Sequence, residues 1–220
     1  GNSDRTITKN IKSIKILINN KFLIKWYAQN LNLNNKKLIH LPIGLDYHAG
    51  FKFRNKYKSI KEFPSNKESY LIKLSKKKIK KEFKMYANWL FNMNEKREKC
   101  LNQIQKNLVY FEEDKVSQIK SWENITKYRF CLCPEGYGLD THRVWETIIL
   151  GSIPVVKSGP LDVMYRKFPV IIVKNWKDVT KKLLLNEYKK IKGKRYDYSY
   201  LYLDFWKKQF NTKKINFFFK

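Results

Sequence analysis

The sequence predicts an α/β protein organised around a parallel sheet. An apolar, β-prone run covers residues 128–133, an amphipathic helical pattern covers residues 141–150, and a β-branched run covers residues 153–156. Pro134 separates the first run from the helix, and Gly151 ends the helix before the second run begins. A strand, a loop, a helix and a strand in this order normally give two parallel strands joined by a right-handed crossover.

Helical patterns and apolar runs alternate along the rest of the chain. In the amino-terminal part we expect a strand or buried segment over residues 14–18, an amphipathic helix over 20–30 and a strand over 37–41. Residues 47–80 are polar and lysine-rich, which predicts a crossover between lobes or a mobile loop. The elements expected after it are a strand within 81–91, a helix over 94–107, a strand over 109–111, a helix over 116–127, a strand over 168–173 and a helix over 176–190.

These elements divide the chain into three parts. Residues 1–80 are expected to form a partial amino-terminal lobe with its crossover, and residues 81–197 a carboxyl-terminal lobe that contains the central strand, helix and strand. Residues 198–220 are aromatic and basic. We expect them to form a helix that packs back on the first lobe, and the alternative is a helix that lies in a membrane interface.

Length and composition favour a soluble globular chain. The 220 residues are 43% hydrophobic and 15% aromatic, which is ample for a packed core, and no apolar run approaches the length of a membrane span. The first residues contain neither a methionine nor a signal-peptide core. We therefore expect a piece of a longer protein, whose missing upstream part could have provided a membrane anchor.

The charge is strongly positive. Lys and Arg number 47 against 19 Asp and Glu, a net charge of +28, which would suit a polyanionic partner. The excess is almost all lysine, is spread along the chain, and accompanies abundant Asn, Ile, Phe and Tyr, the composition that AT-rich codons produce. Compositional drift is therefore favoured and nucleic acid is not expected as a partner; a basic polyanion-binding module is the alternative.

Neither a disulfide framework nor a metal site is expected. Cys131 and Cys133 lie two apart on a predicted strand, where they point to the same face and cannot easily bond each other, and Cys100 is distant in sequence. The acidic residues 112–114 precede a helix, where they favour its dipole. Since the sequence contains no D-x-D motif, we predict no obligatory metal and no cofactor.

The central helix begins with residues suited to an anion. Asp140 or Thr141 is the expected N-cap, and His142, Arg143 and Glu146 lie on neighbouring positions of the first turn. Free backbone N–H groups and a guanidinium there suit a nucleotide diphosphate, and the carboxylate can accept hydrogen bonds from ribose hydroxyls. The alternative is an ordinary surface ion pair between the arginine and the glutamate. The glycines of the preceding loop, Gly136 and Gly138, would let the backbone approach the ligand.

Several linked segments resemble one enzyme family. FCLCPEGYGLDTHRVWE, GSIPVV, SGPLDVMY and FPVIIVKNW, all within residues 127–180, are similar to the carboxyl-terminal donor-binding half of exostosin-like glycosyltransferases, which have the GT-B fold. The resemblance implies two Rossmann-like lobes, the amino-terminal one incomplete here. It also implies an inverting transfer of a sugar from a nucleotide-sugar co-substrate, with UDP as the expected nucleotide, to a glycan or other hydroxyl acceptor.

The same resemblance suggests further site residues. In this family the loop that contains Lys157 and Ser158 closes over the donor, so both residues are candidate donor ligands; otherwise Lys157 is a solvated lysine. An inverting transferase needs a general base, and Asp46 and His48 in the IGLDYH segment are the candidates, with a turn cap and a surface residue as the alternative. A Golgi or endoplasmic-reticulum lumenal enzyme, a cytoplasmic viral-type enzyme and an inactive donor-binding lobe all remain open.

Overall fold

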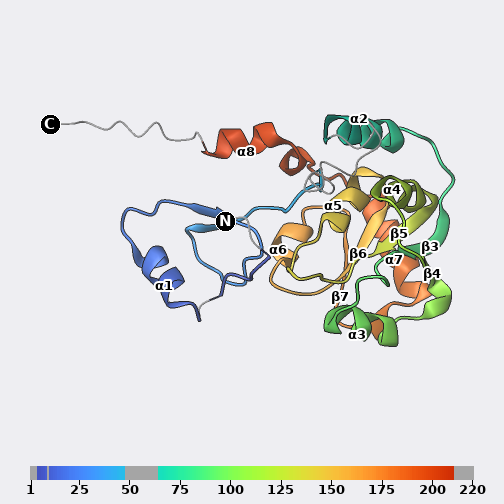
Figure 1. Cartoon of the computed structure of the whole chain (residues 1–220), viewed down its shortest axis with the longest axis horizontal. Helices are drawn as coiled ribbons and strands as arrows, with labels where there is room; N and C mark the ends of the chain where they lie inside the picture. Colours follow the sequence, from blue (N-terminus) through green and yellow to red (C-terminus); the bar gives the residue numbers. More distant parts are fainter. Residues whose placement is uncertain (1–3, 9, 48–63, 211–220) are drawn as a thin grey trace, which may run out of the picture.

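A computed structural model describes residues 4–8, 10–47 and 64–210 of the chain (Figure 1). Its main body is a five-stranded sheet in the order β4-β3-β5-β6-β7, in which every neighbouring pair is parallel. The α/β prediction is therefore confirmed. The strands are β3 (Glu82–Ala87), β4 (Val109–Phe111), β5 (Tyr128–Leu132), β6 (Ile153–Lys157) and β7 (Ile171–Val173).

The order of the strands reverses once within this sheet. The chain moves from β3 outward to β4, and then crosses back to the other side of β3 to form β5, β6 and β7 in turn. Helices cover both faces of such a sheet, and two hydrophobic cores flank it here. The helices are α2 (Pro64–Ser75), α4 (Gln118–Lys127), α5 (His142–Ile149) and α6 (Asp162–Tyr165) on one face, and α3 (Glu95–Gln103) and α7 (Lys181–Lys192) on the other.

Alternation along β5 explains why this strand forms where it does. Cys131 packs into the core beneath α4 and α5, while Phe130 and Leu132 pack into the core beneath α3 and α7, and all three are fully buried. A strand buried on both faces is expected to be apolar throughout, as this run is. The three cysteines of the chain are free thiols buried in these cores.

Side-chain caps and one glycine define the helix ends. Asn94 accepts a hydrogen bond from the backbone N–H of Arg97 at the start of α3, and Thr180 accepts one from Leu183 at the start of α7. Gly151 follows α5 with a φ of +68°, a conformation that L side chains rarely adopt. The helix predicted over 176–190 is divided, because a short 3₁₀ turn (Trp176–Asp178) precedes α7.

For residues 14–18 the expectation is a strand or a buried segment, and the strand is wrong. This segment lies within α1 (Lys12–Asn19), in which Ile14 is buried, and Ile18 packs against a small core formed by Ala28, Leu31 and Leu38. The two residues are four apart and so share one helical face. Ile16, on the other side, is 63% exposed.

The helix expected over residues 20–30 is also wrong. Asn20 accepts a hydrogen bond from the Phe22 backbone N–H and turns the chain, after which β1 (Trp26–Ala28) pairs in parallel with β2 (Leu38–His40). Pairing between segments that are distant in sequence overrides the helical spacing of the apolar residues here. The strand expected over 37–41 is present as β2.

Part of the expected crossover over 47–80 is helical. In α2, Leu71 and Leu74 are buried in the core shared with α4 and α5. Pro64 opens the helix, where its missing N–H is tolerated.

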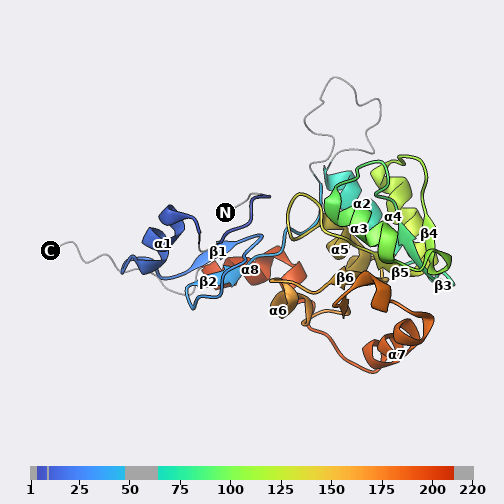
Figure 2. The ribbon, with the colours of Figure 1, turned by 90° about the horizontal axis from the view of Figure 1, so that it is seen from below.

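The carboxyl-terminal helix α8 (Leu203–Phe210) runs from the sheet towards the amino-terminal strands (Figures 1 and 2). The Tyr27 ring lies 4.7 Å from the Phe210 ring, and its hydroxyl donates to the carbonyl of Gln209 over 3.2 Å. Trp206 is buried and donates to the Tyr200 carbonyl. These aromatic contacts join the last helix to the first part of the chain.

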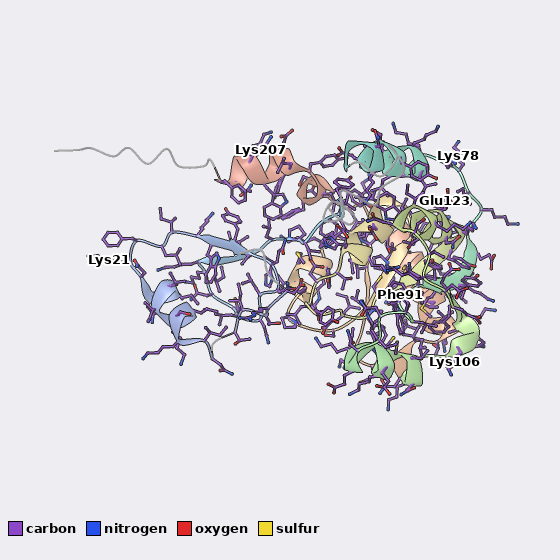
Figure 3. All side chains as sticks on the ribbon, viewed as in Figure 1. Lys21, Lys78, Phe91, Lys106, Glu123 and Lys207 are labelled. Carbon is purple, nitrogen blue, oxygen red and sulfur yellow. The ribbon has the colours of Figure 1, made fainter. Side chains whose placement is uncertain are left out.

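Positive charge is spread over the surface of the described residues. Figure 3 labels Lys21, Lys78, Lys106 and Lys207, which are exposed and lie on widely separated parts of the molecule. None of the described helices combines the length and apolar character required to cross a bilayer.

Burial of Tyr86 on β3 predicts a loss of stability at alkaline pH. Burial, and a hydrogen bond of 2.9 Å from its hydroxyl to the Glu112 carboxylate, raise the pKa of Tyr86 above its ordinary value of 10.0. Above pH 10 the unfolded chain therefore loses this proton while the folded chain keeps it, so the free energy of unfolding falls as pH rises. Tyr86→Phe should reduce this fall between about pH 8 and about pH 11 in urea titrations. Tyr202→Phe, at an exposed tyrosine, is the control. If the free energy of unfolding fell equally with pH in Tyr86→Phe and Tyr202→Phe, the prediction would be wrong.

Candidate functional site

A cleft of about 810 Å³ opens at the carboxyl edge of the large sheet. Asn88 and Phe91, which follow β3, and Gly136, which follows β5, border it together with the first turn of α5. β3 and β5 are the two strands between which the strand order reverses. Open α/β sheets bind ligands just beyond the carboxyl ends of the strands at such a switch point. The exposed ring of Phe91 is labelled in Figure 3.

Arg143 and Glu146 both line this cleft. Glu146 is only 5% exposed, and its Oε1 accepts a hydrogen bond of 3.0 Å from Gln118 on α4. Within the described part of the chain no ion pair joins Arg143 to Glu146, so the surface ion pair considered as the alternative is not formed. Both residues instead contribute to the lining of one cleft.

A second arginine, Arg97 on α3, lines the same cleft and was not predicted from the sequence. Its Nη1 donates to the Asn92 carbonyl over 2.5 Å. Burial lowers the pKa of Arg97, the positive charge of Arg143 lowers it further, and Tyr137 partly offsets both effects. No described carboxylate forms an ion pair with either guanidinium. Two guanidiniums therefore line the cleft, and neither forms an ion pair with a described carboxylate.

Polar atoms without a hydrogen-bond partner gather around this cleft. Of the nine buried side-chain nitrogen and oxygen atoms without a partner in the described residues, five belong to residues that line it. Buried polar groups are normally hydrogen-bonded, so these atoms are available to water or to the polar atoms of a ligand in the cleft. The five atoms are Asn88 Oδ1, Arg97 Nε, Gln118 Oε1, Thr141 Oγ1 and Arg143 Nη1.

Asp140 borders the cleft, but its carboxylate is used inside the protein. It accepts hydrogen bonds from the backbone N–H of Ile43 at 2.8 Å, the Tyr165 hydroxyl at 2.9 Å and Trp145 Nε1 at 3.0 Å, and from the backbone N–H of Thr141. Burial raises the pKa of Asp140, while these four hydrogen bonds lower it. The side chain predicted as a donor ligand is therefore an internal anchor for the loop before α5. Thr141, the alternative, is the N-cap residue.

His142 faces the segment 43–46 that crosses over the start of α5. Its Nδ1 lies 2.8 Å from the Gly44 carbonyl oxygen. Because a carbonyl only accepts, Nδ1 carries the hydrogen, and the neutral ring has its free lone pair on Nε2. Gly44 has a φ of +71°, which favours glycine at this point of the crossing segment.

The two glycines of the loop lie close to other side chains of the protein. A Cβ on Gly138 would lie 2.9 Å from the Asn30 side-chain amide, whose Oδ1 accepts a hydrogen bond from the Asp140 backbone N–H. A Cβ on Gly136 would lie 3.4 Å from Arg97 Nη2. Close approach of Asn30 thus explains Gly138, whereas a Cβ on Gly136 would make only an ordinary van der Waals contact with Arg97, a residue of the cleft lining.

The remaining predicted residues have different positions. Asp46 lines the cleft, and its backbone carbonyl accepts a hydrogen bond of 2.8 Å from Gln118. Lys157 borders a separate small cavity, and the Ser158 hydroxyl donates to Asp162 over 2.6 Å; neither residue is among those that line the cleft. His48 lies outside the described residues.

One signal in the sequence could have indicated Arg97. The chain contains 40 lysines and only seven arginines, so lysine is its default cation. In a chain with so few arginines, each arginine is a candidate for a position that needs the planar, forked donor of a guanidinium. Arg97 and Arg143 are two of the seven arginines. They line the same cleft although 45 residues lie between them in the sequence.

Within the described ranges, no three His, Cys, Asp or Glu side chains are grouped so that they could hold a metal ion. No family model matches the chain, and a search of curated proteins finds no significant match. The functional assignment therefore depends on the cleft and on the sequence motifs that form it.

Proposed function

We propose that the chain is an exostosin-like, inverting glycosyltransferase that binds a nucleotide sugar in this cleft. One observation carries the proposal: Arg143 and Glu146, three residues apart on α5, both line an open cleft at the switch point of a parallel sheet. The guanidinium has no carboxylate partner in the described chain and an unused Nη1. This is the arrangement that the resemblance to the family calls for.

In the proposed reaction the acceptor hydroxyl oxygen forms a bond to the anomeric carbon as the bond from that carbon to the diphosphate oxygen breaks. Negative charge develops on the departing diphosphate, and Arg143 and the N–H groups at the start of α5 stabilise it. Glu146 accepts hydrogen bonds from the ribose through the oxygen that Gln118 does not occupy. The proposed donor is UDP-linked.

The proton of the acceptor hydroxyl needs a base at the edge of the cleft. Asp46 is the proposed base, because it lines the cleft beside Glu146 and follows the segment that crosses the start of α5. His142 is a second group that can accept a proton, since the Gly44 carbonyl holds the hydrogen on Nδ1 and leaves Nε2 as the acceptor. The proposal includes no metal in the transfer.

In this proposal the whole enzyme has the two lobes of the GT-B fold, and the described amino-terminal strands are part of the acceptor-side lobe. Two features support this. The segment 43–46 is joined to the start of α5 by hydrogen bonds to Asp140 and His142, and helix α8 packs against Tyr27. Both connections would hold an acceptor-side lobe next to the donor cleft.

Thermal-shift screening against a panel of nucleotide sugars, followed by a turnover assay with the stabilising donor, tests the proposal. A rise in melting temperature with one donor and release of its nucleoside diphosphate are expected. Binding without turnover would favour an inactive donor-binding lobe. Absence of binding to every nucleotide sugar, with a gel shift by nucleic acid that weakens steeply with salt, would favour the polyanion-binding module instead.

Replacing Glu146 by glutamine should weaken donor binding. The amide cannot accept from Gln118 and the ribose as a carboxylate does, so the affinity for the donor should fall about tenfold, the loss expected for one hydrogen bond to a charged group. Calorimetric titration of UDP measures this. Glu98→Gln, on the exposed side of α3, is the matched control. Equal UDP affinities in Glu146→Gln and Glu98→Gln would show that Glu146 does not bind the ribose.

A further inference from the structure

We propose that Arg97 is a second ligand of the leaving group, and that Arg97 and Arg143 together form a clamp for two linked phosphates. This inference rests on the proposed function for the identity of the nucleoside, and its own support is the geometry around Gly136. Arg97 extends from α3 on one face of the sheet, and Arg143 lies on α5 on the other face. Both arginines line the cleft, one from α3 and the other from α5.

The guanidinium of Arg97 lies beside the first turn of α5. A Cβ built on Gly136 would be 3.4 Å from Arg97 Nη2 and 3.9 Å from Thr141 Cγ2, so the arginine and the N-cap residue of α5 flank the same point. Arg143 is the second residue of that helix. Burial lowers the pKa of Arg97, and the charge of Arg143 lowers it further. Two cations are therefore held close together at a helix N-terminus.

Two guanidiniums that line one cleft without an ion pair to a described carboxylate repel each other, and an anion bound between them relieves this repulsion. Both keep an unpartnered buried nitrogen, Arg97 Nε and Arg143 Nη1, and Thr141 Oγ1 is unpartnered as well. Asn88, which is 3% exposed, adds an unpartnered Oδ1 to the lining of the cleft, an acceptor that suits a hydroxyl of the ligand and not a phosphate oxygen. Arginine binds phosphate oxygens through paired N–H donors, so two arginines suit an anion with two phosphate groups.

The clamp explains a preference for a diphosphate over a monophosphate. A single phosphate can be satisfied by one guanidinium and the backbone N–H groups at the start of α5. The second phosphate then needs another donor, and Arg97 is the residue that reaches the cleft from the opposite helix layer. Loss of Arg97 should therefore reduce the affinity for two linked phosphates more than the affinity for one.

Calorimetric titrations with inorganic pyrophosphate and inorganic phosphate test this without depending on the nucleoside. We expect the wild-type chain to bind pyrophosphate more tightly than phosphate, and Arg97→Ala to lose about 10- to 100-fold in pyrophosphate affinity, with a smaller change for phosphate. Arg97→Lys should restore part of the loss, because it retains the charge without the fork. Arg195→Ala, at an exposed arginine, should bind both probes like the wild type.

Three results would overturn the clamp. They are no pyrophosphate binding by the wild type, equal pyrophosphate affinity in Arg97→Ala and Arg195→Ala, and an equal loss for pyrophosphate and phosphate, which would indicate that Arg97 only supports the loop through Asn92. A chain that binds pyrophosphate through Arg97 but neither binds nor consumes any nucleotide sugar would retain the clamp and remove the proposed function. If Arg97→Ala left nucleotide-sugar turnover unaffected, the proposed function would be retained and the clamp would be removed.

Discussion

Replacing Arg143 by alanine is expected to lower turnover about 100- to 1,000-fold while the chain remains folded, the loss typical when one preorganised donor to a developing anion is removed. Arg143 is half-buried at the start of α5, and its guanidinium carries no ion pair with the described residues. Its removal therefore breaks no described ion pair. The expected effect falls on the departing diphosphate, whose charge grows in the transition state.

Steady-state kinetics with the donor found by screening, together with circular dichroism, measure this result. Arg166→Ala is the matched control, because Arg166 is an exposed arginine whose ion pair with Asp162 spans 3.8 Å. Arg143→Lys should lie between the wild type and the alanine variant, since lysine supplies charge as a single point. Near-normal turnover in a folded Arg143→Ala would end the assignment of this cleft as the donor site.

Replacing Asp140 by alanine is expected to lower the free energy of unfolding by on the order of 3–5 kcal/mol, because buried donors would be left without an acceptor. The carboxylate is 3% exposed and accepts from Ile43, Trp145 and Tyr165 as well as from Thr141. The first of these donors belongs to the crossing segment and the others to the sheet domain. The substitution should therefore release the amino-terminal segment from the start of α5.

Urea titrations of Asp140→Ala and of Asp204→Ala, a control at an exposed aspartate, measure the difference. Asp140→Asn keeps one acceptor oxygen and should lose less, which gives a second value if the alanine variant does not fold. A loss in both Asp140 variants no larger than in Asp204→Ala would show that the anchor contributes little. The assignment of Asp140 as a donor ligand would then deserve a direct binding test.

The central part of the fold could be predicted because its signals are local. β5, α5 and β6 follow one another within residues 128–157, each with its own period and with glycine or proline between them. The same stretch placed Arg143 and Glu146 on one turn of helix, and they do line the cleft together. Short-range spacing was sufficient for both results.

The amino-terminal part could not be predicted in the same way. Its apolar residues have an ambiguous spacing, and the outcome depends on partners distant in sequence: β1 pairs with β2, and Tyr27 packs against α8 from the other end of the chain. The helix expected over 20–30 is replaced by a turn and β1 for this reason. Residues 14–18, expected to be a strand or a buried segment, lie within α1, where Ile14 is buried. Tertiary contacts outweigh weak local preference in such segments.

By itself the sequence determined the parallel α/β core and the pair of residues on α5, because both follow from periodicity and from spacing along a single element. Only the tertiary structure decided that Arg97 joins Arg143 in one cleft and that the Asp140 carboxylate binds the crossing segment. These roles depend on which surfaces meet when helices from opposite layers reach the same edge of the sheet. Separation in sequence does not show which helix surfaces come together at this edge, whereas burial and hydrogen bonding in the folded chain do.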